Sequence, residues 1–171
     1  MSARTLVLLR HAKAETPGDL PDFERSLTAK GRADADAAGA WLADERLHPR
    51  LVICSPAART RQTWHGVAIA LAQAAPGAGS PEVHYAPELY GAGRTEVVDL
   101  LRAVPDEVHT VLIIGHNPTM SDVSALLRPY EQGLPGFELR TAGLAVHRTE
   151  APWSETEPGS MPQVLSHTAR A

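Results

Sequence analysis

The segment Thr110-Val-Leu-Ile-Ile-Gly-His-Asn-Pro118 contains the strongest strand signal of the chain. Its apolar, mostly β-branched run ends at a glycine and predicts a buried strand over 110–114. Asn117 and Pro118 then predict a helix start, with the asparagine as N-cap and the proline in the first helical position. A buried strand that passes through a short turn into a helix is the repeating unit of folds with a parallel sheet.

Two earlier segments repeat this arrangement. Leu6-Val-Leu-Leu9 and Leu51-Val-Ile-Cys54 both predict short buried strands. Helices are expected after them over 29–43, with Thr28 as N-cap, and over about 56–75. Apolar spacing gives these helices the predicted inward positions Ala33, Ala37, Ala40 and Trp41, and Trp64, Val67, Ala68, Leu71 and Ala72, respectively.

The rest of the chain continues the alternation of strands and helices. A weak strand is expected over 83–86, a short helix over 95–103, and edge strands over 142–147 and 163–166. Because no internal repeat or interdomain linker is visible, residues 1–171 are expected to form a single domain. We therefore predict an α/β three-layer sandwich with a mostly parallel central sheet flanked by helices.

Composition and charge narrow the class of protein. Hydrophobic residues make up 43% of the chain, and a net charge of −4 offers no basic field to nucleic acid. No window approaches the roughly 18 apolar residues of a membrane span, and the first residues lack a secretory signal. The single cysteine, Cys54, excludes an internal disulfide. A cytoplasmic protein without nucleic-acid or membrane partners is expected.

Cationic and imidazole side chains follow three of the predicted strands. Arg10 and His11 follow the strand 6–9, Arg59 lies just beyond the strand 51–54, and His116 follows the strand 110–114. Because the carboxyl ends of parallel strands share one edge of a sheet, these side chains are expected to converge. Such a pocket suits phosphoryl transfer, since arginine grips two phosphoryl oxygens and neutral histidine can act as a nucleophile.

The order of motifs resembles a known family. The series R-H-A-K (10–13), S-P-A-A-R-T-R-Q-T (55–63) and G-H-N-P (115–118) resembles the histidine phosphatase superfamily. The segment D-F-E-R-S-L-T-A-K-G (22–31) is similar to its short, SixA-type phosphohistidine phosphatase branch. The resemblance spans roughly residues 5–127. It implies a phosphoglycerate-mutase-like fold and a phosphatase that needs no metal or cofactor and forms a covalent phosphohistidine intermediate.

The resemblance also implies roles for individual residues. His11 matches the nucleophile, Arg10 and Arg59 match the two phosphate-binding arginines, and His116 matches the second histidine. Arg25 matches a further arginine that the short branch directs to the phosphate. All five are therefore candidate site residues. The resemblance implies that His11 attacks the phosphorus and that the other four bind the substrate phosphate.

The remaining chemistry-bearing positions are less regular. Glu88, in A-P-E-L-Y-G (86–91), is the best match for a carboxylate that protonates the leaving group. Ala12 and Lys13 stand where many mutase-type members have Gly and then Glu or Gln. A phosphohistidine substrate needs less help from a proton donor than an alcohol leaving group does. Cys54 and Arg59 are one residue too close for the Cys-x5-Arg of cysteine phosphatases, so Cys54 is interpreted as a buried hydrophobe.

Three functions stay open on the sequence alone. The first is a phosphatase acting on a phosphohistidine-carrying protein domain or on a small phosphate ester, through an open site bordered by the loop 128–138 with Tyr130 and Phe137. The second is a phosphoglycerate-mutase-like enzyme or sugar-phosphate phosphatase of the same superfamily, which requires a competent Glu88. The third is a catalytically silent phosphate-binding module. The sequence predicts neither an oligomeric state nor a role for residues 150–171.

Overall fold

The computed structural model describes residues 3–91, 93–130 and 138–171, which build one six-stranded sheet with helices on both faces. The strands are β1 (Arg4–Arg10), β2 (Leu51–Cys54), β3 (Glu82–Tyr85), β4 (Thr110–Gly115), β5 (Gly143–Thr149) and β6 (Gln163–Thr168). The helices are α1 (Ala29–Asp44), α2 (Ala58–Ala74), α3 (Arg94–Arg102) and α4 (Thr119–Leu127). Short 3₁₀ helices cover Asp22–Glu24, Pro87–Leu89 and Trp153–Glu155.

The sheet is mostly parallel, in the order β3-β2-β4-β1-β5-β6. Strands β1 to β4 run parallel, whereas β5 is antiparallel to β1 and β6 is antiparallel to β5. The predicted α/β sandwich is therefore confirmed. The prediction of two edge strands near the C-terminus is wrong for β5, which lies between β1 and β6 and pairs with both.

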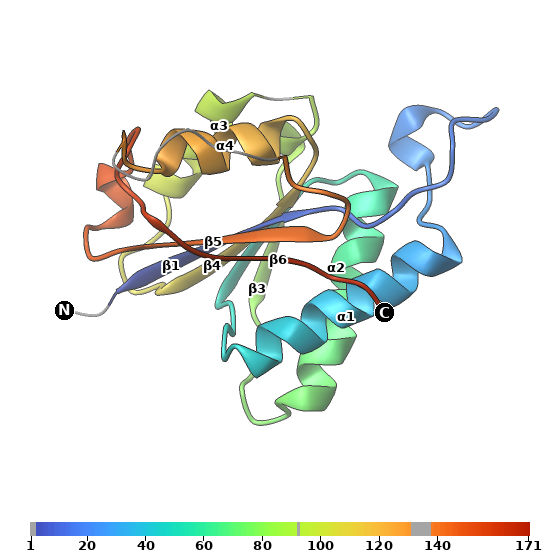
Figure 1. Cartoon of the computed structure of the whole chain (residues 1–171), viewed down its shortest axis with the longest axis horizontal. Helices are drawn as coiled ribbons and strands as arrows, with labels where there is room; N and C mark the ends of the chain where they lie inside the picture. The colour runs from blue at the N-terminus through green and yellow to red at the C-terminus, as the bar shows by residue number, and fades with distance from the viewer. Residues whose placement is uncertain (1–2, 92, 131–137) are drawn as a thin grey trace.

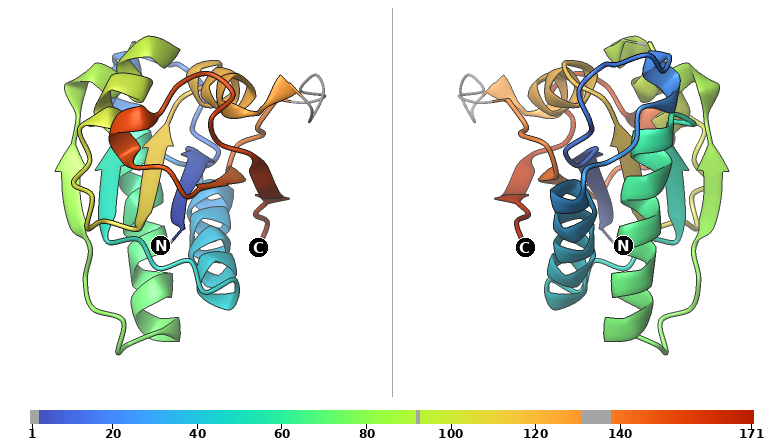
Figure 2. Two further views of the ribbon diagram at one scale, coloured as in Figure 1. Left: turned by 90° about the vertical axis from the view of Figure 1, so that its left-hand side faces the viewer. Right: turned by 90° about the vertical axis from the view of Figure 1, so that its right-hand side faces the viewer.

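Two helices cover each face of the sheet (Figure 1), and the end-on views in Figure 2 show the same layers. Side chains alternate along a strand, so that Val7 and Leu9 of β1 pack toward α1 and α2 while Leu6 and Leu8 pack toward α3 and α4. Burial on both faces explains why β1 and β4 are continuous apolar runs. Among the described residues, no helix combines the length and apolar character needed to cross a bilayer.

The predicted inward face of α1 is only partly correct, because Ala37 and Trp41 are half-buried against the core while Ala40 is exposed. The buried positions of this helix are Gly31, Asp34, Ala35, Ala38, Gly39 and Leu42. Small residues face α2 because the two helices approach closely, and a Cβ on Gly39 would lie 2.6 Å from the carbonyl oxygen of Val67. Trp41 was expected in the core but is half-buried and stacks on His167, with ring centroids 4.8 Å apart. On α2, the prediction holds for Trp64, Val67 and Leu71, whereas Ala72 is exposed.

The start of α4 also differs by one residue from the prediction. Pro118 is the N-cap instead of the first helical residue, and α4 begins at Thr119. Asn117 still serves the helix start, because its Oδ1 accepts hydrogen bonds from the backbone N–H and the hydroxyl of Ser121 at 3.3 and 2.9 Å. The turn after β4 is therefore held by the side chain of Asn117.

Candidate active site

His11 lies at the carboxyl end of β1, where its backbone N–H donates to the carbonyl of Gly115 at the end of β4. Its side chain is 8% exposed. The ring Nδ1 lies 2.7 Å from the carbonyl oxygen of Ala12. Because a carbonyl only accepts hydrogen bonds, Nδ1 carries the ring proton in the neutral imidazole and Nε2 carries the lone pair.

The surroundings of His11 keep its imidazole neutral. Burial, together with the nearby guanidinium groups of Arg59, Arg10 and Arg25, lowers the pKa of His11 to about 4, against the raising effect of the Ala12 carbonyl. A neutral imidazole with its lone pair on Nε2 is the nucleophilic form of histidine. The three arginines that act on His11 are the three that the sequence predicts for this site.

His116 follows β4 and faces His11, with ring centroids 5.4 Å apart. Its Nε2 pairs with Ser55 Oγ at 2.8 Å, and Ser55 is fully buried after β2. Its Nδ1 is buried and has no hydrogen-bond partner among the described residues. Burial, followed by the charge of Arg59, lowers the pKa of His116 to about 3. The pairing of β4 with both β1 and β2 brings His116 between the ends of those strands.

Arg10 and Arg59 each present a buried donor to the same region. The Nη1 of Arg10 donates to the carbonyl of Leu139 at 3.0 Å, and the Nη groups of Arg59 donate to Asp22. The Nε of each arginine is buried and unpaired within the described part of the chain. Buried donors without partners are rare because each costs about 1–3 kcal/mol. When the ring proton of His116 is on Nδ1, these groups offer an anion three buried hydrogen-bond donors near His11.

Arg25 also reaches the site, where it contacts Asp22, a residue that the sequence analysis did not select. Its Nε donates to Asp22 Oδ1 at 3.0 Å and its Nη1 donates to the carbonyl of Glu15 at 2.8 Å. The hydroxyl of Tyr90 donates to Asp22 Oδ2 at 2.7 Å. Tyr90 also contacts the ring of His116, with centroids 5.6 Å apart. Asp22 opens the segment 22–31 quoted above, which was the one available signal for it.

The segment 22–31 is fastened to the loop after His11 by the start of α1. The hydroxyl of Thr28 caps the helix by accepting the N–H of Gly31 at 2.9 Å, and the N–H of Thr28 donates to the carbonyl of Lys13 at 2.9 Å. A Cβ at Gly31 would overlap that same carbonyl oxygen. The threonine and the glycine of this segment therefore hold it against the backbone next to His11.

Glu88 lies on the 3₁₀ helix Pro87–Leu89 and is exposed. Within the described residues, its carboxylate makes no hydrogen bond or ion pair. Tyr90, two residues later, is the side chain of this loop that reaches the site. At the expected rim, Tyr130 is 94% exposed, whereas Phe137 and most of its loop lie outside the described residues.

Cys54 is a buried residue next to the site. Cys54 is fully buried at the end of β2, and burial raises the pKa of its thiol to about 12, so that it stays protonated. This agrees with its interpretation as a small hydrophobe. No group of three or more histidine, cysteine or acidic side chains in the described ranges is arranged to hold a metal ion.

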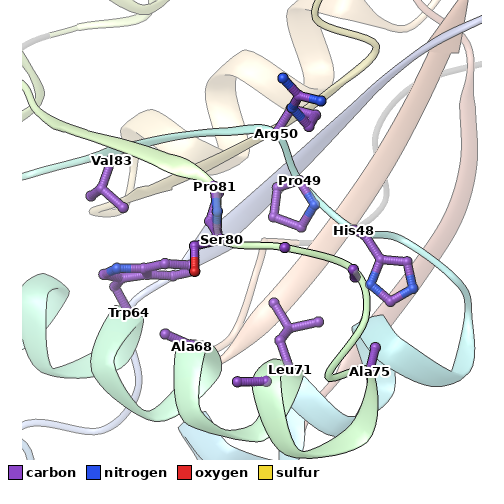
Figure 3. Close-up of a pocket in the computed structure, with 13 residues that line it drawn as sticks. His48, Pro49, Arg50, Trp64, Ala68, Leu71, Ala75, Ser80, Pro81 and Val83 are labelled. Carbon is purple, nitrogen blue, oxygen red and sulfur yellow. The ribbon is translucent and has the colours of Figure 1, made fainter.

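A separate cavity of about 230 Å³ lies near the amino ends of β2 and β3 (Figure 3). Trp64, Ala68 and Leu71 of α2 form one wall, and segments that precede β2 and β3 form the other, including Arg50 and Pro81. Because Arg50 precedes β2 while Ser55 follows it, this cavity and His11 are at opposite ends of the strands. The cavity is largely apolar and shares no residue with the histidine–arginine cluster.

Comparison with known proteins supports the family resemblance. The model of the histidine phosphatase superfamily (branch 1) matches residues 6–85. A Mycobacterium tuberculosis protein described as uncharacterized is 33% identical over 168 residues, covering 95% of this chain and 100% of its own length. The match therefore extends beyond the part of the chain covered by the family model.

Solved structures give the same result for the fold. A protein assigned as the phosphohistidine phosphatase SixA of Nakamurella multipartitia superposes with a TM-score of 0.83 at 33% identity, over 100% of this chain and 99% of the other. A protein given the same assignment from Agrobacterium tumefaciens has a TM-score of 0.75 at 30% identity, over 96% and 97%. The tungstate complex of the protein histidine phosphatase SixA, at 23% identity and a TM-score of 0.79 over 96% of each chain, shares the fold.

Proposed function

Because the chain belongs to the histidine phosphatase superfamily, branch 1, we propose that it is a phosphatase that forms a phosphohistidine intermediate on His11. One observation carries the proposal. The neutral His11 imidazole, with its proton fixed on Nδ1 by Ala12, is accompanied by buried, unpaired donors on Arg10, Arg59 and His116. A nucleophile surrounded by hydrogen-bond donors is what transfer of a phosphoryl group requires.

The proposed reaction has two displacements at phosphorus. In the first, the Nε2 lone pair of His11 forms a bond to phosphorus, and the bond from phosphorus to the leaving group breaks with its electron pair leaving on that group. In the second, a water oxygen bonds to phosphorus, the P–N bond breaks, and the electron pair returns to Nε2 while water loses a proton. The products are inorganic phosphate and free His11. Throughout, Nδ1–H keeps its hydrogen bond to Ala12 and fixes the ring orientation.

The buried donors stabilise the charge that develops on the phosphoryl oxygens. Arg10 and Arg59 supply guanidinium N–H groups, and His116 supplies Nδ1–H when its Nε2 accepts the hydroxyl hydrogen of Ser55. Ser55 Oγ can take that arrangement because it accepts the N–H of Ala57 at 3.4 Å and has its own hydrogen left to donate. Fixed donors in a water-poor site are worth far more than in solution.

The substrate class that fits best is a phosphohistidine on a partner protein. The described site offers no carboxylic acid to protonate a leaving group, because Glu88 is exposed without a hydrogen bond or ion pair and Asp22 is held as a carboxylate by its donors. A P–N bond needs such help less than an ester bond does. The aromatic side chains of Phe23 and Tyr90 pack edge to face and are exposed beside the cluster, as a surface for a protein substrate would be.

Phosphoenzyme trapping tests the nucleophile. The wild-type protein is incubated with radiolabelled phosphoramidate and compared with His11→Ala and with His65→Ala, which removes an exposed histidine of α2. We expect an acid-labile, alkali-stable label on the wild type and on His65→Ala and none on His11→Ala. Label that persists in His11→Ala would identify another nucleophile, and a wild type that takes up no label would contradict the phosphatase proposal.

Substrate competition tests the partner class. A phosphohistidine-carrying protein domain, a sugar phosphate and a phosphoglycerate are offered to the wild type and to Phe23→Ser, which removes one exposed apolar side chain outside the histidine–arginine cluster. We expect the protein substrate to be hydrolysed most efficiently and to be the one whose KM rises in the variant. Preferential hydrolysis of a small ester, unchanged in Phe23→Ser, would favour a metabolite phosphatase of the same superfamily.

A further inference from the structure

Building on the proposed function, we infer that Asp22 is a positioning residue that presents Arg59 to the phosphoryl group. Asp22 lies on the 3₁₀ helix Asp22–Glu24, far from Arg59 in the sequence, and 50% of its side chain is exposed. Exposed acidic residues near a phosphate site usually repel the substrate, so its place here needs an explanation. The contacts of its carboxylate and of its carbonyl supply one.

Asp22 grips one edge of the Arg59 guanidinium group at two points. The Nη1 of Arg59 donates to the backbone carbonyl of Asp22 at 2.8 Å, and the Nη2 donates to Oδ2 at 3.0 Å. A guanidinium group has a second edge, which carries Nε–H and the remaining hydrogen of Nη2. Nε is buried and unpaired within the described ranges. The grip therefore fixes the planar group and leaves its Nε edge for two oxygens of a phosphoryl group.

The Asp22 carboxylate is itself held by donors on other elements. Arg25 Nε donates to Oδ1 at 3.0 Å, and the Tyr90 hydroxyl donates to Oδ2 at 2.7 Å. The hydrogen bond from Tyr90, followed by the two arginines, keeps the pKa of Asp22 well below its usual range. Asp22 is therefore an acceptor at neutral pH and has no proton to give to a leaving group. It acts through Arg59 instead of on the substrate.

The charge of the cluster fits this role. Asp22 pairs with Arg25 and Arg59, so that these three side chains keep one net positive charge, and Arg10 adds another that nearby Glu138 partly offsets. With His11 and His116 neutral, the cluster stays cationic and attracts a phosphoryl anion. Without Asp22 the arginines would remain, but Arg59 would lose the contact that orients its guanidinium group. Arg59 is more deeply buried than Arg25, with 7% of its side chain exposed against 19%.

The test compares Asp22→Ala, Asp22→Asn and Glu24→Gln, each in the wild-type and Arg59→Ala backgrounds. Glu24→Gln is the matched control, because it removes an acidic charge from the same 3₁₀ helix without touching Arg59. We expect Asp22→Ala to slow phosphoenzyme formation from phosphoramidate by about 10- to 100-fold through kcat, the range seen for small misplacements. Asp22→Asn, which keeps an accepting oxygen, should recover most of this loss. In the Arg59→Ala background, neither Asp22→Ala nor Asp22→Asn should slow phosphoenzyme formation further.

A nuclear magnetic resonance readout separates this inference from the proposed function. The Nε–H signal of Arg59, identified by its loss in Arg59→Lys, should shift when inorganic phosphate is added to the wild type and respond weakly in Asp22→Ala. If the rate of phosphoenzyme formation and the Arg59 signal response were unchanged in Asp22→Ala, the inference would be overturned. It would also be overturned if Asp22→Ala and Asp22→Asn bound phosphate more tightly to the same extent, because Asp22 would then be an anion that competes with the substrate. A wild type that binds phosphate at Arg59 but forms no phosphoenzyme would instead contradict the proposed function alone.

Discussion

Two serine–histidine pairs of equal length illustrate how position decides what a residue does. Ser55 Oγ lies 2.8 Å from His116 Nε2, and Ser124 Oγ lies 2.8 Å from His147 Nε2. His147 uses its other ring nitrogen to contact the carbonyl of Met161 at 2.9 Å, so that the pair is satisfied within the core. His116 keeps an unpaired Nδ1 beside His11. The Ser55–His116 pair is therefore available for chemistry, and the Ser124–His147 pair is structural.

This contrast predicts different outcomes for one substitution at two sites. Ser55→Ala should lower kcat about tenfold, because His116 loses the partner that fixes its tautomer and orientation. Ser124→Ala should leave kcat unchanged, and each variant should lose about 1 kcal/mol of stability with its hydrogen bond. Steady-state kinetics and chemical denaturation measure both quantities. Equal turnover in the two variants would show that Ser55 has no part in orienting His116.

The ionisation of His11 gives a second prediction at this scale. Because its pKa is lowered to about 4, the imidazole stays neutral as the pH falls from 8 to about 5 and becomes protonated only below that. Nuclear magnetic resonance titration of the ring should give a midpoint near 4 instead of the ordinary value near 6.5. Arg59→Met should raise the midpoint by removing one of the nearby charges. A wild-type midpoint at or above 6.5 would contradict the neutral nucleophile.

Part of the residue-scale picture was predictable from sequence. Arg10 ends β1, His11 and His116 follow β1 and β4, and Arg59 lies in the first turn of the helix after β2. The rule for parallel sheets brings such residues together. Asp22 lies in a loop segment without hydrophobic periodicity, and its partners are set by how that loop folds back over α2. No local pattern encodes that contact, so the positioning carboxylate emerged only from the three-dimensional arrangement.

At the scale of elements, α1 shows why helical periodicity was an incomplete guide. The helix contains many alanines and little apolar contrast, so several faces are almost equally suitable for burial. Close approach of α2 selects the face that carries Gly39, where any larger side chain would collide with the Val67 carbonyl. Helix positions and boundaries followed from caps and strand signals, whereas the buried face depended on the neighbouring helix.

Two glycines of α1 should therefore respond differently to alanine. Gly39→Ala should destabilise the fold by about 1–3 kcal/mol through overpacking against α2, although alanine favours an isolated helix by about 1 kcal/mol. Its activity per folded molecule should be unchanged. Gly31→Ala should reduce activity as well as stability, because the added methyl group displaces the Lys13 backbone next to His11. Thermal unfolding and kcat are measured for both variants. Full activity in Gly31→Ala would contradict the predicted displacement of the backbone next to His11.

At the scale of the whole molecule, the length of the strands separates the histidine–arginine cluster from the apolar cavity. The histidine–arginine cluster lies at the carboxyl ends of the strands, and the apolar cavity beside Trp64 lies near the amino ends of β2 and β3. Along α2, Arg59 and Leu71 are about 18 Å apart at 1.5 Å per residue. Changes confined to the cavity should not reach the site.

Filling the cavity tests this separation. Ala68→Leu adds apolar volume to a space of about 230 Å³ and should raise stability by about 0.5–2 kcal/mol without changing kcat. Ala74→Leu places the same side chain at an exposed position of α2 outside the cavity and should leave stability unchanged. Chemical denaturation and phosphatase assays provide the comparison. Lower kcat in Ala68→Leu alone would reveal coupling between the cavity and the cluster.

The sheet order also sets when the site can form as the chain is made. Strand β4 lies between β2 and β1, although it is synthesised after β1, β2 and β3. A nascent chain that ends before β4 therefore has no strand to join β1 to β2. The facing backbone groups of these two strands stay unpaired until β4 has been synthesised. Insertion of β4 closes this gap and delivers His116 between His11 and Ser55 in one event. The candidate site would then form only when this long-range pairing is made, and its appearance would report the insertion of β4.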